Sequence, residues 1–159
     1  MTKSEITIVP YSEEYRDHIK KLNYEWLEKY FFVEPGDVEQ LSDPQLHIIN
    51  KGGHIYFAKF NGEIVGTISL MKTGIGEYEL AKMAVTEKYK GLGIGKKLLE
   101  HCIQKAKNLK ASKLSLFSNT KLTSAIHLYK KYGFIEIPLP AQLHYERADI
   151  MMEKYFQEF

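Results

Sequence analysis

Hydrophobic and polar positions follow strand and helix periods in turn along the first third of the chain. Residues 5–11 (EITIVPY) alternate as a strand does, and Ser12, a residue type that favours helix N-caps, precedes a run with helical spacing. The apolar positions of that run are Tyr15, Ile19, Leu22, Trp26 and Tyr30. An acidic stretch follows, and we expect one short helix in it between the Pro35-Gly36 turn and Pro44.

Three strand-like segments come next. HIYFAKF (54–60) and EIVGTISLMK (63–72) are joined by Asn61-Gly62, a pair that suits the two-residue type I′ turn of a hairpin. EYELAKMAV (77–85) continues the series after Gly74-Ile75-Gly76. These segments predict an antiparallel meander.

The second half of the chain returns to alternating strands and helices. A helix is predicted from Ile94, with Leu98, Leu99, Cys102 and Ile103 on its apolar face, and KLSLFS (113–118) is a strand after it. Residues 120–134 indicate a second helix closed by Gly133, and a final strand pair lies in 134–138 and 146–156. No repeat or linker interrupts this order, so we expect one α/β domain with a mixed sheet over residues 1–159.

Composition and charge exclude several classes of function. The 159 residues carry a net charge of only +2, so the chain lacks the general excess of basic residues that is typical of nucleic-acid-binding proteins. One cysteine cannot form an internal disulfide, and neither a secretory signal nor a membrane-spanning run is evident. The six histidines show no metal-ligand spacing. We therefore expect a cytoplasmic protein with no metal site and no nucleic-acid or membrane partner.

A glycine-rich loop, KGLGIG (90–95), lies between the strand 77–85 and the helix that begins at Ile94. The dinucleotide pattern GxGxxG requires glycine where Lys96 stands, and the nucleotide P-loop requires a hydroxyl where Lys97 stands. What remains is a bare backbone turn at a helix N-terminus, which favours an anion such as a diphosphate, with Lys90, Lys96 and Lys97 adding positive charge. The alternative is a tight turn with solvated lysines.

Two motifs resemble those of one enzyme family. KGLGIG resembles the motif [RQ]xxGx[GA] of the GNAT superfamily of N-acetyltransferases, with Lys90 in place of the usual arginine or glutamine. ELAKMAV is similar to the family's central strand, and SAIHLYKKYGF (124–134) resembles its downstream segment AxxLYxKxGF. The resemblance implies a mixed, mostly antiparallel sheet that is splayed at its centre, with helices on both faces. It also implies that acetyl-CoA binds in the split.

The resemblance further implies a set of cofactor-binding residues. The pantetheine arm is expected to pair with the backbones of Met83, Ala84 and Val85. Asn119 is expected near the pantetheine or the diphosphate. The loop residues expected to hold the diphosphate are Lys90, Gly91, Leu92, Gly93, Ile94, Gly95 and Lys96.

Tyr129 matches the tyrosine that the family places beside the sulfur of coenzyme A, and a phenol there can protonate or hydrogen-bond the departing thiolate. Without the motif, Tyr129 would be interpreted as a core aromatic residue. Cys102, on the apolar face of its helix, is expected to be a core residue.

Glu79 is the candidate general base, because histone-acetylating relatives keep a glutamate six residues before the position of Val85. Alternation predicts that Glu79 shares a face with Ala81, Met83 and Val85. Solvent as the base and an exposed, ordinary Glu79 remain alternatives. The competitors for lining the acceptor pocket are Glu77, His144 and Tyr145.

Two hypotheses about function follow. In the first, the protein transfers the acetyl group of acetyl-CoA to a primary amine of a small molecule or protein, by direct attack in a ternary complex. In the second, it is a non-catalytic domain that binds or senses acyl-CoA. The two failed phosphate patterns disfavour a nucleotide-binding module. Trp26, Tyr30, Phe31 and Phe32 are expected in the core, the acceptor wall or a homodimer contact.

Overall fold

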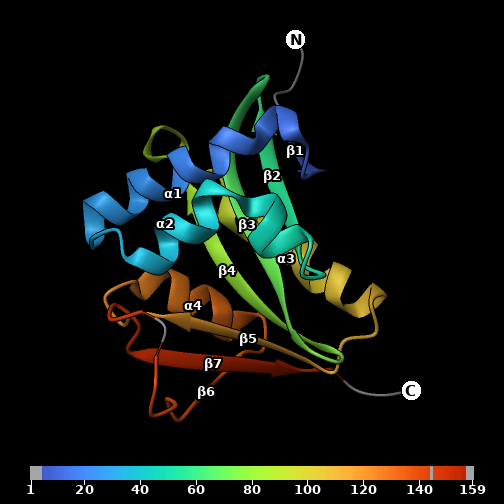
Figure 1. Ribbon diagram of the computed structural model, residues 1–159, viewed down its shortest axis with the longest axis vertical. Helices are drawn as coiled ribbons and strands as arrows, with labels where there is room; N and C mark the ends of the chain where they lie inside the picture. The colour runs from blue at the N-terminus through green and yellow to red at the C-terminus, as the bar shows by residue number, and fades with distance from the viewer. Residues whose placement is uncertain (1–4, 144, 157–159) are drawn as a thin grey trace.

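The computed structural model describes residues 5–143 and 145–156. Its centre is a seven-stranded sheet in the order β1-β2-β3-β4-β5-β7-β6 (Figure 1). Only the β4–β5 pair is parallel, and every other neighbouring pair is antiparallel. The strands are β1 (Ile6–Pro10), β2 (His54–Phe60), β3 (Glu63–Gly74), β4 (Glu77–Val85), β5 (Lys113–Ser118), β6 (Ile135–Ile137) and β7 (Ile150–Tyr155). This agrees with the predicted mixed, mostly antiparallel α/β fold.

Four α-helices and three short helical turns accompany the sheet. The α-helices are α1 (Arg16–Tyr30), α2 (Pro35–Ser42), α3 (Ile94–Asn108) and α4 (Thr123–Lys131). The short turns are the 3₁₀ turns η1 (Glu13–Tyr15) and η3 (Glu87–Tyr89) and the π-helical turn η2 (Gln45–Ile49). None of the helices described is both long and apolar enough to cross a membrane.

Local signals explain where most of these elements begin and turn. Asn61 and Gly62 both have positive φ, 52° and 78°, which confirms the predicted type I′ turn between β2 and β3. Two predictions about helix N-termini were wrong. Pro35 and Gly36 form the first turn of α2, because Glu34 and Asp37 make a capping box there. Ser12 makes no side-chain cap, and η1 separates it from α1.

Helices cover both faces of the sheet, as predicted. In Figure 1, α1 and α2, in blue and cyan, cross one face, and α3, in yellow, lies behind the other. The larger core cluster joins the sheet to α3 and to Tyr129 of α4, and it includes Leu98, Leu99 and Cys102. The smaller cluster joins Ile19 of α1 and Leu41 of α2 to β2. The two faces therefore have separate cores.

The sheet opens at its centre. The parallel pairing of β4 with β5 covers only four residue pairs, from Glu77 with Lys113 to Leu80 with Leu116. Beyond these pairs, β4 remains paired with β3 and β5 remains paired with β7, so β4 and β5 separate from each other. Within the described part of the chain, no strand pairs with the β5-facing edge of residues 81–85. The predicted central splay is confirmed.

A β-bulge in β4 lies at the mouth of this split. Ser69 pairs with Ala81 and Thr67 pairs with Ala84, so two steps along β3 correspond to three along β4. Lys82, with φ of 56°, takes up the extra residue in a left-handed conformation. The predicted alternation is therefore wrong beyond Ala81. The face of Glu79 and Ala81 continues with Ala84, whereas Met83 and Val85 pack against the core on the α3 side.

Candidate active site

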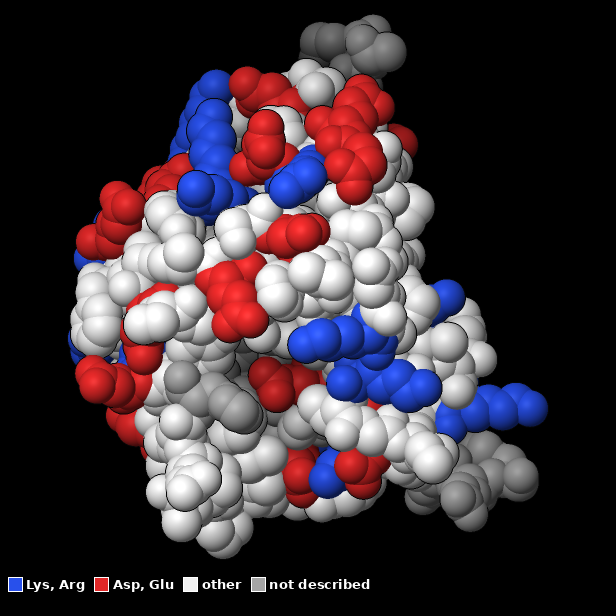
Figure 2. Space-filling model, viewed as in Figure 1, with Lys and Arg blue, Asp and Glu red and all other residues white. Residues whose placement is uncertain are grey.

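A pocket of about 740 Å³ lies at the split. Its lining comes from both faces of the sheet: α1 and α2 on one side, α4 on the other, and β3, β4 and β5 between them. Figure 2 shows a hollow on the α1–α2 face, with an acidic side chain inside it and basic side chains along one edge. Because the two strands have separated, groups on opposite faces of the sheet reach one common space.

The glycine loop presents a row of backbone N–H groups at the start of α3. Gly91 and Gly93 have φ of 86° and 77°, and Gly93 is the N-cap of α3. The first backbone bond into the helix runs from the Lys97 N–H to the Gly93 carbonyl, and no described residue accepts a hydrogen bond from the N–H groups of residues 91–96. Left-handed glycines followed by a helix N-terminus make a concave site for an anion.

Side chains contribute little to this loop. A Cβ added at Gly91 or Gly93 would have nothing within 4 Å, so the backbone is open to approach. Ile94 is buried in the core, while Leu92 and Lys96 are exposed. The main chain of the loop is thus accessible to a ligand, and a backbone grip on a diphosphate stays a prediction.

Lys90 belongs to a small group of charged side chains beside the loop. Its Nζ lies 2.6 Å from Glu87 Oε1 and donates to Tyr30 Oη at 2.8 Å. Glu87 is shared with Lys29, whose Nζ lies 3.0 Å from Oε2, so two lysines and one carboxylate keep one net positive charge beside the loop. That Lys90 adds positive charge for a diphosphate stays a prediction. Lys90 also ties the loop to the C-terminal end of α1.

The other predicted cofactor residues lie in or beside the pocket. Met83 and Asn119 line it, whereas Ala84 and Val85 continue β4 beyond the lining and Gly95 lies in the first turn of α3. The Asn119 side chain donates to the Arg147 carbonyl at 2.7 Å and accepts from the Lys121 N–H at 2.8 Å. These bonds fix the chain after β5, so Asn119 shapes the pocket wall through the turn that it holds.

Tyr129 reaches the pocket from α4. The residue is 9% exposed, and its ring packs edge-on against Phe134, with centroids 5.9 Å apart. Tyr129 lines the pocket, and no described residue hydrogen-bonds its hydroxyl. Burial raises the pKa of Tyr129 to about 12, so the phenol is protonated at neutral pH and can donate a hydrogen bond.

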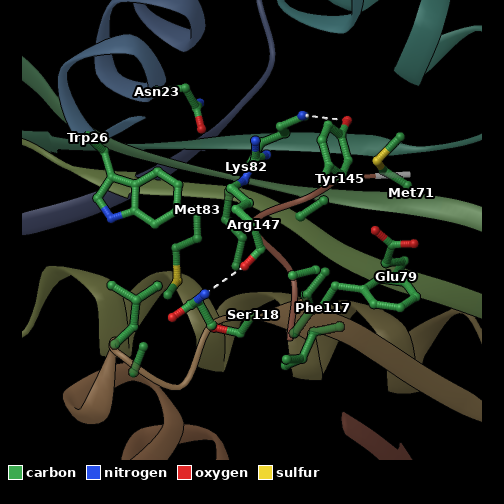
Figure 3. A pocket seen from close by; sticks show the side chains of 18 of the residues that line it. Asn23, Trp26, Met71, Glu79, Lys82, Met83, Phe117, Ser118, Tyr145 and Arg147 are labelled. Atoms are coloured by element: carbon green, nitrogen blue, oxygen red, sulfur yellow. Dashed lines mark hydrogen bonds between the residues drawn. The ribbon is translucent and has the colours of Figure 1, made fainter. Parts of the chain in front are cut away.

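Glu79 lies in the pocket lining on the α1–α2 face, half-buried between Met71 of β3 and Ser115 of β5. Figure 3 shows its carboxylate in the same part of the pocket as Met71, Tyr145 and Phe117. Tyr129 belongs to the core on the other face. The candidate acid and base therefore approach the split from opposite sides of the sheet.

The competitors of Glu79 fall in different places. Tyr145 lines the pocket. Glu77, at the start of β4, lies outside the lining, with its carboxylate 3.7 Å from Lys113 Nζ. His144 lies outside the described residues.

The aromatic run at the end of α1 divides in two. Trp26, Tyr30 and Phe31 line the pocket, and Phe32 is exposed. Cys102 is fully buried, and burial raises the pKa of its thiol to about 12, which confirms it as a core residue. Among the residues described, no group of three or more His, Cys, Asp or Glu side chains could hold a metal ion.

Several pocket residues were not predicted from the sequence. Met71 and Phe117 border Glu79, and Lys82 and Arg147 lie at the mouth of the pocket (Figure 3). The E-P-G-D run at residues 34–37 could have indicated the capping box that begins α2. Nothing local marks Lys82 or Arg147, because their partners are tens of residues away in the chain.

Comparison with known proteins agrees with this geometry. The profile of the acetyltransferase (GNAT) family matches residues 15–134. The uncharacterized N-acetyltransferase YvbK of Bacillus subtilis is 32% identical over 101 residues, which are 62% of this chain and 65% of that protein. The N-alpha-acetyltransferase of Sulfurisphaera tokodaii is 29% identical over 120 residues, again covering 65% of its length. The chain thus spans a little under two thirds of these curated relatives.

Solved structures match over nearly the whole chain. A GNAT-family acetyltransferase from Staphylococcus aureus Mu50 superposes with a TM-score of 0.86 at 26% identity, covering 96% of this chain and all of that one. A GNAT-family acetyltransferase from Elizabethkingia anophelis, crystallised with acetyl-CoA, gives a TM-score of 0.62 at 28% identity, covering 95% and 98%. The chain belongs to the acetyltransferase (GNAT) family.

Proposed function

We propose that this protein is an N-acetyltransferase that moves the acetyl group of acetyl-CoA to a primary amine in a ternary complex, with residues 1–159 acting as one catalytic domain. One observation carries the proposal: the split between β4 and β5 gives Tyr129 and Glu79, from opposite faces, access to the same pocket. A donor and an acceptor can then meet without a covalent intermediate on the protein.

The residues present fit acetyl-CoA. The N–H groups of residues 91–96 suit a diphosphate, and the unpaired edge of residues 81–85 suits the amides of a pantetheine arm, which would add to the sheet as a short strand does. When bound, acetyl-CoA supplies the thioester whose acyl group is transferred. A backbone N–H on the open edge of β4 can polarise a carbonyl placed beside it.

Each candidate catalytic residue has one task in the transfer. The C–N bond forms as the C–S bond breaks, so the amine must lose a proton and the sulfur must have its negative charge stabilised. Glu79 accepts a proton from the acceptor's ammonium group, directly or through water, and the neutral amine that results attacks the thioester carbonyl. Tyr129 donates a hydrogen bond to the departing sulfur. The two tasks concern different groups, the amine and the sulfur, and the two side chains reach the pocket from opposite faces of the sheet.

The test is acetyl transfer itself. The purified protein is incubated with acetyl-CoA and a panel of primary amines, and released CoA thiol is measured together with the acetylated product. We expect thiol release that depends on at least one amine. Tight binding of acetyl-CoA with no transfer to any amine would favour the non-catalytic acyl-CoA-binding domain, and tight binding of ATP without binding of CoA would exclude both.

A further inference from the structure

A buried cluster of four charged side chains lies beside the pocket on the α1–α2 face. Glu34 and Asp37 come from the start of α2, Lys82 comes from the β4 bulge, and Arg147 precedes β7. The side chain of Asp37 is fully buried, and those of Lys82 and Arg147 are 4% and 14% exposed. Two cations face two anions, so the cluster has no net charge when all four are ionised.

Asp37 is the centre of the cluster. Arg147 donates to both of its oxygens, at 2.7 Å and 2.8 Å, and Lys82 Nζ donates to Oδ1 at 2.8 Å. Burial opposes ionisation of Asp37, but these hydrogen bonds outweigh it and lower its pKa to about 2. Burial also lowers the pKa of Lys82, against the attraction of Asp37. Removing one partner would leave a buried charge uncompensated.

The cluster connects three distant parts of the chain. Arg147 Nη1 also donates to Glu34 Oε2 at 3.0 Å, and Glu34 Oε1 accepts from the Glu146 N–H at 2.9 Å. The start of α2, the bulge of β4 and the segment before β7 are therefore fixed to one another. These are the segments that border the acceptor side of the pocket.

Tyr145 is the side chain that these contacts immobilise. Its hydroxyl accepts from Lys82 Nζ at 2.9 Å and donates to Gln40 Oε1 at 2.8 Å. The Arg147 guanidinium carbon lies 4.3 Å from the ring centroid and Lys82 Nζ lies 4.6 Å from it. A Cβ added at Gly36 would lie 3.2 Å from Tyr145 Cε1, so the absence of a side chain there makes room for the ring.

Tyr145 connects the buried charged cluster to the pocket. Figure 3 shows Tyr145 between Lys82 and Met71, with Glu79 in the same part of the pocket, and all four residues belong to its lining. Because the hydroxyl is engaged by Lys82 and Gln40, Tyr145 offers a fixed ring to whatever occupies the space beside Glu79.

We infer that Tyr145 is the specificity-determining wall of the acceptor site, and that Lys82, Asp37 and Arg147 are positioning residues that act through it. The inference rests on the proposed function, since it assigns the space beside Glu79 to the acceptor amine. An acceptor whose hydrocarbon stem fits against a rigid ring is selected over one that does not fit. Contacts of this kind typically discriminate by about 10-fold or more.

The experiment compares the order of preference among amines. Wild type, Tyr145→Ala and Lys82→Met are assayed with primary amines of graded stem length and width, and acetyl-CoA binding is measured by calorimetry. We expect each variant to change the order of preference, with kcat/KM for the best wild-type acceptor falling about 10-fold or more. Acetyl-CoA affinity should stay within about threefold, a change of under 1 kcal/mol. Lys88→Met, at an exposed lysine outside the lining, is the matched control.

A double variant separates positioning from general damage. If Lys82 acts through Tyr145, adding Lys82→Met to Tyr145→Ala causes no further change in acceptor preference. Gly36→Ala disturbs the ring without removing a charge, so it tests the inference even if Lys82→Met fails to fold.

Each outcome of the experiment decides between the two claims. An unchanged order of preference in folded Tyr145→Ala, or an equal loss of acetyl-CoA affinity, overturns the inference while leaving acetyl transfer intact. Failure of the wild type to acetylate any amine, with acetyl-CoA still bound, refutes the proposed function and with it the acceptor role of Tyr145.

Discussion

Replacing Tyr129 with phenylalanine tests the candidate acid with the least disturbance of the fold. The ring of Tyr129 is buried against Phe134, and phenylalanine keeps that packing. The hydroxyl bonds to no described residue, so its loss leaves no described partner unsatisfied. The variant should fold normally and bind acetyl-CoA within a few fold of the wild type.

The expected loss of rate follows from the raised pKa of the phenol. Burial raises the pKa of Tyr129 to about 12. A thiol has a pKa of about 8.5, so complete proton transfer from Tyr129 to the thiolate is unfavourable by roughly 5 kcal/mol. We therefore expect Tyr129 to act as a hydrogen-bond donor and the proton that finally reaches the sulfur to come from solvent. A hydrogen bond to a charged group contributes about 1.5–3 kcal/mol, which corresponds to a loss of about 10- to 150-fold.

Single-turnover acetyl transfer is the appropriate assay, because it excludes product release. The loss should appear in the maximal rate and not in acetyl-CoA affinity, since the interaction strengthens only as the sulfur gains charge. Tyr132→Phe, at the C-cap of the same helix and outside the pocket lining, is the control and should keep the wild-type rate. A wild-type rate in Tyr129→Phe would make Tyr129 a packing residue, and a loss above about 10⁴-fold would show that it gives up its proton.

Three further predictions concern the loop, the base and the buried cluster. Gly93→Asp should abolish acetyl-CoA binding in a folded protein, because Gly93 has positive φ and a carboxylate repels a diphosphate. The control Gly95→Ala, whose Cβ would only touch Val85 at 3.9 Å, should bind acetyl-CoA within a few fold of the wild type. Equal affinities of the two variants in calorimetry would exclude the loop from the site. Glu79→Gln should lower turnover chiefly below the pKa of the amine, and an unaltered pH profile would make solvent the base. The pKa of Asp37 is lowered from 3.8 to about 2, so its ionised form stabilises the fold fully above about pH 4, and about 2 kcal/mol of the free energy of unfolding is lost as pH falls through 2. Denaturant titrations of Asp37→Asn should lack that loss. The same decrease of the free energy of unfolding with falling pH in both proteins would contradict the prediction.

Local signals in the sequence were sufficient for most of the fold. The Asn61-Gly62 turn, the glycine loop before α3 and the periodicity of α1 and α3 each depend on neighbouring residues, and each is where the sequence predicts it. The opening of the sheet was predicted only through resemblance to the GNAT family. No periodicity shows that the pairing of β4 with β5 stops after four residue pairs.

What could not be predicted depends on long-range contacts. Lys82 has ordinary strand neighbours, so nothing indicates that it takes a left-handed conformation and displaces Met83 and Val85 to the other face. Asp37 and Arg147 are 110 positions apart, and their pairing exists only in the folded chain. The contacts of Lys90 were not predicted for the same reason, because Tyr30, one of its two partners, lies at the end of α1.

The split sheet also determines which parts of the chain can diverge without harm. The N–H groups of the loop before α3, which no described residue accepts from, belong to the main chain, whereas the proposed acceptor side of the pocket is bordered by side chains of α1, α2 and the segment before β7. Substitutions at Gly36, Gln40 or Tyr145 leave that loop untouched. A descendant of this sequence could therefore acquire a new amine substrate within a few substitutions while inheriting its acetyl donor unchanged.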